Sequence, residues 1–291
     1  MITVLESIKL STQFLTEKGI ESPRTNAEIL LANILNCKRL DLYMLFDRPL
    51  TEVEIQHYRE YLKRRGTFEP LQYITGKVEF YGIEILVDRS VLIPRPETEL
   101  LVENIIKQCS VKNILSILDI GCGSGNISIA LAYNLSSAKI TATDISDEAL
   151  KIGIQNAKQN NVADKINFRK HDILKNDLDS FQNFDIIVSN PPYVSKENYS
   201  TLQKEIINFE PRSAVTDELD GYTFFIVIAE KAYKKLNDNG KLFFEIAEGQ
   251  SDEVVQIMSA NNFTNIEVIK DYQRIDRIVY GELNESRSSK G

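Results

Sequence analysis

The sequence is poor in residues on which several common chemistries depend. Its 291 residues include three cysteines and two histidines. Cys37, Cys109 and Cys122 are odd in number and widely spaced, which excludes a disulfide framework and fits a reducing compartment. Nothing pairs them with further ligands, so we expect no metal site. His57 and His171 stand alone, and we interpret both as structural or exposed rather than catalytic.

Basic clusters and long apolar runs are also scarce. The net charge is -8, and no basic block of the kind that binds nucleic-acid phosphates is present. The densest basic run, Lys63-Arg64-Arg65, is expected to be the solvated end of a helix that stops at Gly66. No stretch has the length of a membrane span, and the first residues lack a leader pattern. We expect a cytoplasmic protein without a direct nucleic-acid or membrane partner.

The most informative motif is the tetrapeptide Asn190-Pro191-Pro192-Tyr193, which follows the apolar run 184–189. It offers a planar amino group a side-chain carbonyl, a backbone carbonyl fixed by rigid prolines, and an aromatic face. A strand that simply stops at a proline turn would look similar. Our preferred interpretation is a clamp for an amino group.

A second motif lies upstream, where the apolar run 117–120 breaks into alternating glycines. The loop reads Gly121-Cys122-Gly123-Ser124-Gly125 and is followed by a helical pattern. Glycines permit positive φ and let a ligand approach the backbone, while the N–H groups of the helix start face the ligand. Asn126 replaces the third glycine of a dinucleotide fingerprint, which argues against nicotinamide or flavin. A plain strand-to-helix turn would also explain the loop.

An acidic residue ends the next predicted strand. Asp144 follows strand 139–143 about twenty residues after the glycine loop, where doubly wound folds present a carboxylate to ribose. It could instead belong to the turn before the next helix, although Ser146 is the better cap and would leave Asp144 free. Together the motifs predict a nucleoside-bearing cofactor beside an amino-group clamp.

The order of elements predicts two parts. Residues 1–75 show helical spacing, with Pro23 suited to a helix start, and form a small helical bundle that could dock a partner. Residues 76–95 alternate like a β-hairpin linker. Residues 96–283 alternate helix and strand, which predicts an α/β, doubly wound, mainly parallel sheet with an antiparallel closing pair. The polar tail 284–291 is expected to be flexible.

The chain resembles a known family. The glycine loop, the strand-end acid and Asn190-Pro191-Pro192-Tyr193 resemble those of class I S-adenosylmethionine-dependent methyltransferases that act on planar nitrogen. Further stretches, 70–76 (Pro-Leu-Gln-Tyr-Ile-Thr-Gly), Phe80 and 93–99 (Ile-Pro-Arg-Pro-Glu-Thr-Glu), resemble the release factor glutamine methyltransferases, the HemK/PrmC family. The resemblance spans nearly the whole chain and implies the seven-stranded class I methyltransferase fold.

The resemblance also implies roles for individual residues. The donor would be S-adenosyl-L-methionine, with the loop backbone from Gly121 to Gly125 along its methionine part. Asp144 would bind its ribose, and Asp172 and Ile173 its adenine, although a turn residue and a core residue would fit there too. The acceptor would be the glutamine of the Gly-Gly-Gln motif in class 1 peptide-chain release factors. That glutamine would bind at the tetrapeptide, walled by Tyr193 and Phe80.

Several choices stay open on the sequence alone. Cys122 could be a nucleophile, but a small residue tolerated in a tight turn fits better. Arg95 could meet the cofactor, a partner or a surface carboxylate; Glu99 suits a helix dipole, and Glu97 and Glu210 have no assigned role. The alternative functions are methylation of another protein glutamine, as in a ribosomal protein, or of an amino group on a nucleic-acid base. A third is a cofactor-binding scaffold without activity.

Overall fold

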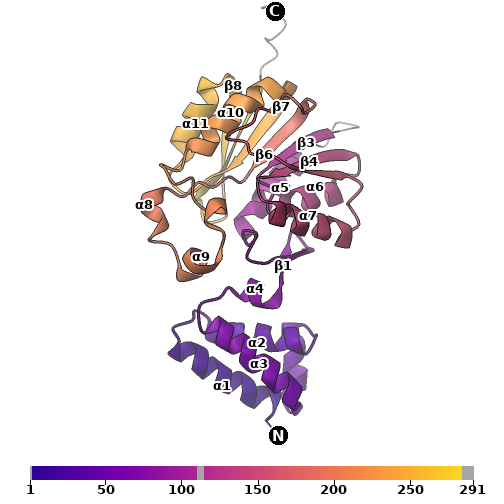
Figure 1. The fold of residues 1–291 in the computed structure, drawn as a ribbon, viewed down its shortest axis with the longest axis vertical. Helices are drawn as coiled ribbons and strands as arrows, with labels where there is room; N and C mark the ends of the chain where they lie inside the picture. The colour runs from indigo at the N-terminus through magenta and orange to yellow at the C-terminus, as the bar shows by residue number, and fades with distance from the viewer. Residues whose placement is uncertain (1, 110–114, 284–291) are drawn as a thin grey trace, which may run out of the picture. The chain divides into compact units, whose positions relative to one another are not determined.

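The computed structural model describes residues 2–109 and 115–283. They fall into two compact units, residues 2–77 with 203–209 and residues 78–202 with 210–283 (Figure 1). Each unit has its own buried hydrophobic core. The predicted flexible tail, 284–291, lies outside the described residues.

The first unit is helical, as the spacing of its apolar residues predicts. Thr3 and Thr51 form capping boxes at the starts of two helices, and Pro23 occupies the first turn of another. Its helices are α1 (Val4–Glu17), α2 (Pro23–Ile34), the 3₁₀ helix η1 (Arg39–Leu45), α3 (Glu52–Arg65), α4 (Leu71–Thr75) and α9 (Lys204–Phe209).

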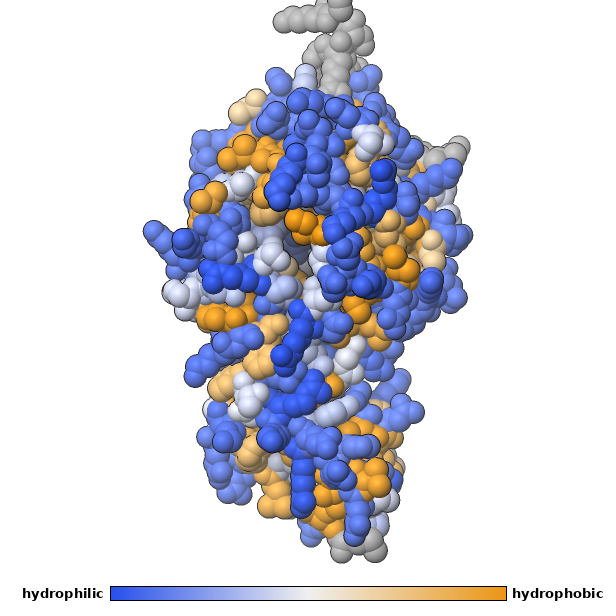
Figure 2. Space-filling model, viewed as in Figure 1, coloured by the Kyte–Doolittle hydropathy of each residue, from blue (hydrophilic) through white to orange (hydrophobic). Residues whose placement is uncertain are grey.

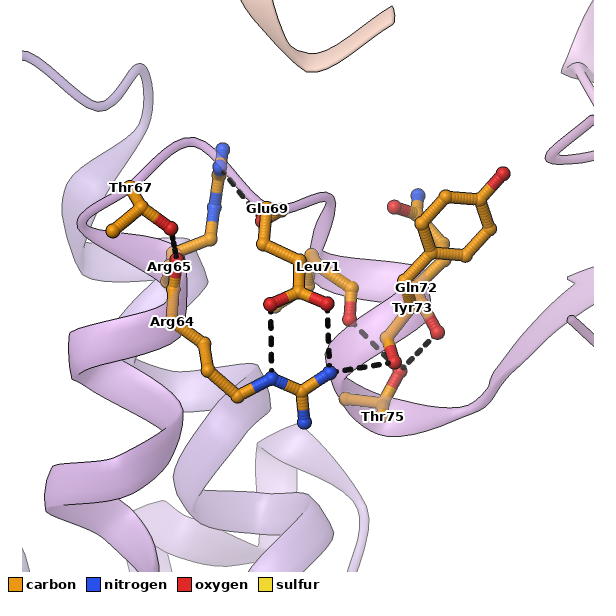
Figure 3. Close-up of polar contacts among 8 residues, drawn as sticks. All are labelled: Arg64, Arg65, Thr67, Glu69, Leu71, Gln72, Tyr73 and Thr75. Carbon is orange, nitrogen blue, oxygen red and sulfur yellow. Dashed lines mark hydrogen bonds and ion pairs between the residues drawn. The ribbon is translucent and has the colours of Figure 1, made fainter. Parts of the chain in front are cut away.

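The end of α3 differs from the prediction of a solvated basic run. Arg65 is 4% exposed and donates to Asn26 Oδ1 at 2.7 Å and to the Glu69 carbonyl at 3.1 Å, and it pairs with Glu205 at 2.6 Å. Arg64 binds the Glu69 carboxylate through two nitrogens (Figure 3). Helix α3 does end before Gly66 with basic residues in its last turn, as predicted. The predicted solvation was wrong for Arg65, because its partners come from α2, α9 and the loop after α3, which spacing along one helix does not reveal.

The second unit is built on a seven-stranded sheet preceded by a hairpin, which confirms the predicted fold class. The hairpin is β1 (Lys77–Phe80) and β2 (Ile83–Leu86). The sheet strands are β3 (Leu115–Ile120), β4 (Ala138–Asp144), β5 (Ile166–Lys170), β6 (Phe184–Ser189), β7 (Leu236–Glu245), β8 (Phe263–Lys270) and β9 (Asp276–Leu283). Their order is β5-β4-β3-β6-β7-β9-β8. Strand β9 is inserted antiparallel to both neighbours, so the closing pair is antiparallel as expected.

Helices flank the sheet on both sides (Figure 1). On one side α6 packs against α5 and α7, and α10 packs against α11 in a separate group. The helices of this unit are α5 (Pro96–Gln108), α6 (Asn126–Asn134), α7 (Asp147–Gln159), α8 (Lys196–Tyr199), η2 (Arg212–Ala214), α10 (Thr223–Lys235) and α11 (Ser251–Ala260). The short helices α4, α8, α9, η1 and η2 have too few turns to give a periodic signal.

Hydrophilic residues dominate the surface face drawn in Figure 2, with hydrophobic residues in separate groups. No helix among residues 2–109 and 115–283 combines the length and apolar character needed to cross a membrane.

The register of the parallel strands fixes where functional residues meet. Ile120 pairs with Thr143 on one side of β3 and with Ser189 on the other. Ser189 in turn pairs with Phe244 of β7. The carboxyl ends of β4, β3, β6 and β7 therefore lie next to one another at one edge, where doubly wound sheets bind ligands.

Candidate active site

The glycine loop connects β3 to α6 at this edge. Gly121, Gly123 and Gly125 have φ values of 75°, 52° and 78°, which side-chain-bearing residues rarely adopt. A Cβ on Gly121 or Gly123 would meet no atom within 4 Å, so their outer faces are open to a ligand. Asn156 of α7 holds the loop from behind by donating to the Ser124 carbonyl at 3.0 Å. The loop is thus a fixed backbone surface open on one side.

Asp144 lies beside this loop at the end of β4. Its carboxylate accepts the Gly123 N–H and the Ser146 N–H, each at 2.9 Å. Ser146 caps α7, as predicted, but this does not leave Asp144 free. The Asp144 side chain ties the loop to the start of α7. Burial raises the pKa of Asp144, and the backbone donors oppose that rise. Its oxygens still have further lone pairs that could accept ribose hydroxyls.

Beneath the loop lies a second buried acid, Asp119 of β3. It is 0% exposed, and Ser128 of α6 donates to its Oδ2 at 2.6 Å, while Oδ1 has no partner among the described residues. Burial raises the pKa of Asp119 to about 7. Burial also raises the pKa of the Cys122 thiol well above its ordinary value, and both Asp119 and Asp144 add to the rise. A thiolate is disfavoured there, which favours the interpretation of Cys122 as a small turn residue.

Asn190-Pro191-Pro192-Tyr193 begins where β6 ends, next to the glycine loop. The half-buried Asn190 donates through Nδ2 to Thr98 Oγ1 of α5 at 3.2 Å. The Tyr193 carbonyl accepts from Gln250 Nε2 at 3.1 Å. Contacts from α5 and from the segment before α11 therefore fix both ends of the tetrapeptide.

Tyr193 and Phe80, the aromatic residues of the predicted clamp, lie on different elements of the second unit. Tyr193 packs against the hydrophobic core, and burial raises the pKa of its hydroxyl, which is therefore neutral near pH 7. Phe80, at the end of β1, is only 1% exposed. The hairpin that carries it is tied to α5 because Glu99 accepts the Tyr81 N–H at 2.8 Å. Glu99 thus has the structural role favoured from the sequence.

The predicted adenine-facing residues follow β5. Asp172 accepts the N–H groups of Leu174 and Lys175 at 3.1 and 3.3 Å and pairs with the Lys175 ammonium at 3.2 Å. Burial acts to raise the pKa of Asp172, but these partners leave it below its ordinary value. Ile173 is 7% exposed and belongs to the core. Both residues have local structural roles, and their contact with adenine stays a prediction.

The loop before α5 is held by an ion pair. Arg95 binds Glu210 at 2.5 Å, and the other carboxylate oxygen of Glu210 accepts the Ile93 N–H at 3.3 Å. Glu210 is 6% exposed, so Arg95 neutralises a buried charge. Of the roles left open for Arg95, the structure shows pairing with a carboxylate, but that carboxylate is buried and not on the surface as expected. Glu97 lies in the first turn of α5, as the sequence indicated.

Residues with metal-binding or acid–base chemistry are sparse around these elements. In the two described stretches, no group of three histidine, cysteine or acidic side chains could hold a metal ion. His171 packs edge-on against Phe181, and burial lowers its pKa. It is neutral near pH 7 and has a packing role, in line with the structural interpretation.

Sequence reasoning missed three residues that surround the tetrapeptide. Thr98 was noted only as part of a motif, and Glu245 and Gln250 were not noted at all. Glu245 ends β7 and is 2% exposed, and hydrogen bonding from Thr98 and Asn190 lowers the pKa of its carboxyl group. The signal that could have found it is its place as an acid at a strand end beside the strand that carries the clamp.

Comparison with known families agrees with this geometry. Residues 6–76 match the family model described as the PrmC N-terminal domain, and residues 96–214 match the methyltransferase small domain. A Pyrococcus furiosus methyltransferase superposes with a TM-score of 0.52 at 18% identity, covering 70% of this chain and 91% of that one. The hMettl16 catalytic domain, in complex with MAT2A 3'UTR hairpin 6, gives 0.56 at 16% identity, covering 81% and 84%. These structures show a shared fold.

Sequence relatives are much nearer. The release factor glutamine methyltransferase of Chlorobaculum tepidum is 38% identical over 282 residues, which cover 94% of this chain and 95% of the relative. That of Flavobacterium psychrophilum is 40% identical and covers 90% and 92%. With a methyltransferase fold, both family models and full-length relatives, the chain belongs to the release factor glutamine methyltransferase family and is a methyltransferase.

Proposed function

We propose that this enzyme transfers a methyl group from S-adenosyl-L-methionine to the side-chain amide nitrogen of the glutamine in the Gly-Gly-Gln motif of class 1 peptide-chain release factors. One observation carries the proposal. Ile120 and Ser189 are register partners, so the glycine loop and the clamp start side by side. A donor on the loop and an acceptor at Asn190 would then share one edge of the sheet. The names of the full-length relatives support the choice of acceptor.

The residues at the loop fit the cofactor. The open faces of Gly121 and Gly123 allow the cofactor to lie along the backbone, and Asp144 has carboxylate lone pairs beside them. When bound, S-adenosyl-L-methionine supplies an electrophilic methyl group. Asp172 and Ile173 remain the proposed neighbours of its adenine. Glycines beside the target glutamine would let the substrate chain approach closely.

The chemical difficulty is the acceptor, because an amide nitrogen is a poor nucleophile. Its lone pair is delocalised, and rotation about an amide bond is opposed by about 18–20 kcal/mol. Hydrogen bonds contribute only about 0.5–1.5 kcal/mol each, whereas fixed orientation can contribute about 7–11 kcal/mol. We infer that Asn190 Oδ1 and the Pro191 carbonyl aim the nitrogen and accept the positive charge that grows on its hydrogens. Tyr193 and Phe80 would wall the amide plane.

The methylated nitrogen is cationic and strongly acidic, so it loses a proton without a tuned base. The neutral, packed His171 agrees with this. The role of this chain is therefore chiefly to bind and orient the two reactants.

The test is the Asn190→Ala variant. We expect turnover on release factor to fall at least about 100-fold while cofactor affinity stays near that of the wild type. Asn198→Ala is the matched control, because Asn198 is exposed in α8 and eight positions away. Calorimetry with the cofactor and methyl incorporation into release factor give the two readouts. Most of the turnover surviving in Asn190→Ala would disprove the clamp.

The acceptor is tested separately with labelled methyl donor. Release factor, release factor with the Gly-Gly-Gln glutamine replaced by alanine, ribosomal protein, free DNA and free RNA are compared as acceptors. We expect label only in the unmodified release factor. Label found only in nucleic acid, or only in ribosomal protein, would replace the proposed substrate.

A further inference from the structure

Glu245 is a buried carboxylate that the proposed mechanism leaves without a role. Ser189 and Phe244 are register partners, so the residues that follow them, Asn190 and Glu245, lie at the same level at the carboxyl edge of the sheet. Glu245 is 2% exposed. Such a charge is costly to bury, and it lies beside Asn190, the side chain on which the proposed clamp depends.

The hydrogen bonds around Glu245 have a direction. Asn190 Nδ2 donates to Thr98 Oγ1 at 3.2 Å, and Thr98 is 1% exposed, so its own O–H needs a buried acceptor. Hydrogen bonding from Thr98 and Asn190 lowers the pKa of the Glu245 carboxyl. A carboxylate only accepts, so the amide atom that Asn190 turns toward it is the NH2 group. Oδ1 is then the atom left to accept from a substrate N–H.

We propose that Glu245 is a positioning residue: its ionised carboxylate, together with the Thr98 hydroxyl, holds Asn190 Nδ2 and so fixes which end of the carboxamide meets the acceptor nitrogen. The inference rests on the proposed function, because it assigns a part of the same clamp. A flipped carboxamide would place the NH2 group of Asn190 against the NH2 group of the substrate glutamine. The substrate nitrogen would then lose the hydrogen bond that orients it. The second oxygen, Glu245 Oε2, has no partner among the described residues.

The Glu245 carboxyl ionises at a pH at which enzyme activity can be measured. Its pKa is raised to about 7, chiefly by burial and also by Glu97 of α5, while Thr98, Arg277 of β9 and Asn190 act in the opposite direction. Above that pH the ionised group enforces the orientation. Below it, the protonated group gains an O–H that can donate to Oδ1, and the flipped carboxamide becomes acceptable.

The other titratable group that faces this carboxyl is Tyr193. Burial first, and Glu245 second, raise the pKa of its hydroxyl, so Tyr193 stays neutral across the range. A rise of activity through about pH 7 therefore does not report on Tyr193. Asp119 also has a pKa raised to about 7, so the rise is assigned to Glu245 only if it disappears in Glu245→Gln.

The first experiment compares Glu245→Gln with the wild type and with Glu248→Gln, a matched control because Glu248 is exposed in the loop after β7. We expect kcat of Glu245→Gln on release factor to fall about 10- to 100-fold, with an unchanged KM for cofactor and no rise of kcat through pH 7. The control keeps the wild-type rate and pH profile. A Glu245→Gln variant with the wild-type kcat and pH rise would overturn the positioning role.

Variants of Thr98 guard against a fold defect in Glu245→Gln. Thr98→Val removes the hydroxyl that links Asn190 to Glu245, and Thr98→Ser keeps it. We expect Thr98→Val to lose kcat as Glu245→Gln does, and Thr98→Ser to restore most of it. Equal rates for the valine and serine variants would contradict the proposed link.

A readout without substrate separates this inference from the proposed function. The side-chain amide ¹⁵N–¹H signals of Asn190, identified by their absence in Asn190→Ala, should shift with pH through about 7 in the wild type and stay constant in Glu245→Gln. A wild-type enzyme that methylates no release factor but shows this titration would refute the function and keep the contact. An active enzyme whose Asn190 signals do not change with pH would support the function and refute the contact with Glu245.

Discussion

The two sides of the active site are held by different kinds of contact. On the glycine-loop side, the Gly123 N–H donates to Asp144, 21 positions away. The shape of the loop comes from the positive φ angles of its own glycines. On the clamp side, Asn190 binds Thr98 across 92 positions, and the Tyr193 carbonyl binds Gln250 across 57. The contacts of the glycine loop therefore span 21 and 32 positions, whereas those of the tetrapeptide span 57 and 92 and need α5 and the segment before α11 to be in place.

Each side also contains one buried acid, Asp119 beneath the loop and Glu245 behind the clamp. Burial is the first cause that raises the pKa of each to about 7. A raised pKa in the folded state means that stability is greatest at low pH and is lost as pH rises through 7. The two acids thus weaken the fold near neutral pH on both sides.

The largest expected effect follows from these acids. Between pH 5 and pH 8 the wild type should lose roughly 2–3 kcal/mol of unfolding free energy for each acid. Asp119→Asn and Glu245→Gln should each avoid the loss from the acid they replace, because the new amide does not ionise. Urea unfolding of each protein at both pH values measures the loss. The exposed Glu248 provides the control Glu248→Gln, which should follow the wild type. A variant that parallels the wild type at both pH values would mean that its acid titrates normally.

The next prediction breaks the clamp side alone. Gly221 has a φ of 91°, and a Cβ there would lie 2.5 Å from the Tyr193 carbonyl oxygen. Gly221→Ala must therefore shift the backbone next to the tetrapeptide. We expect turnover to fall roughly 30-fold, equivalent to about 2 kcal/mol, with unchanged cofactor affinity.

The control for Gly221→Ala is Gly19→Ala in the first unit. Gly19 has a similar φ of 75°, but a Cβ there meets nothing within 4 Å. It carries the backbone strain without the contact, so stability should fall by about 1 kcal/mol and turnover should not change. Equal losses of turnover in the two variants would mean that strain, and not the position of Tyr193, is responsible.

The difference between the two sides also decides what could be predicted from the sequence. The glycine loop, the strand-end Asp144 and the helix cap Ser146 are local patterns, and the structure confirms their elements. The doubly wound sheet follows from alternating periodicity. The position of Asn190 beside the glycine loop could also be predicted, because apolar strand 184–189 ends there and parallel strands share an edge.

The parts that could not be predicted depend on distant pairing. Glu245 looks like any acid after an apolar strand until β7 is known to lie beside β6. The insertion of β9 between β7 and β8 is not encoded in the order of strands. Arg65 has the local signature of a solvated helix end, and only the fold brings Asn26 and Glu205 to it. The segment Gln203–Phe209 likewise belongs to the first unit, although it is distant in sequence from the rest of that unit.

The smallest expected effect sharpens the comparison from the cofactor side. Asp144 accepts one backbone N–H on each carboxylate oxygen, from Gly123 and from Ser146, whereas an asparagine has only one accepting oxygen. Asp144→Asn should therefore leave one donor unpaired and weaken cofactor binding about tenfold, or about 1.4 kcal/mol, while kcat at saturating cofactor changes little. Calorimetry and steady-state rates separate the two, with Asp147→Asn, an exposed neighbour, as control. A large loss of kcat at saturation would show that the glycine loop and the tetrapeptide are coupled, so that a change on one side alters the other.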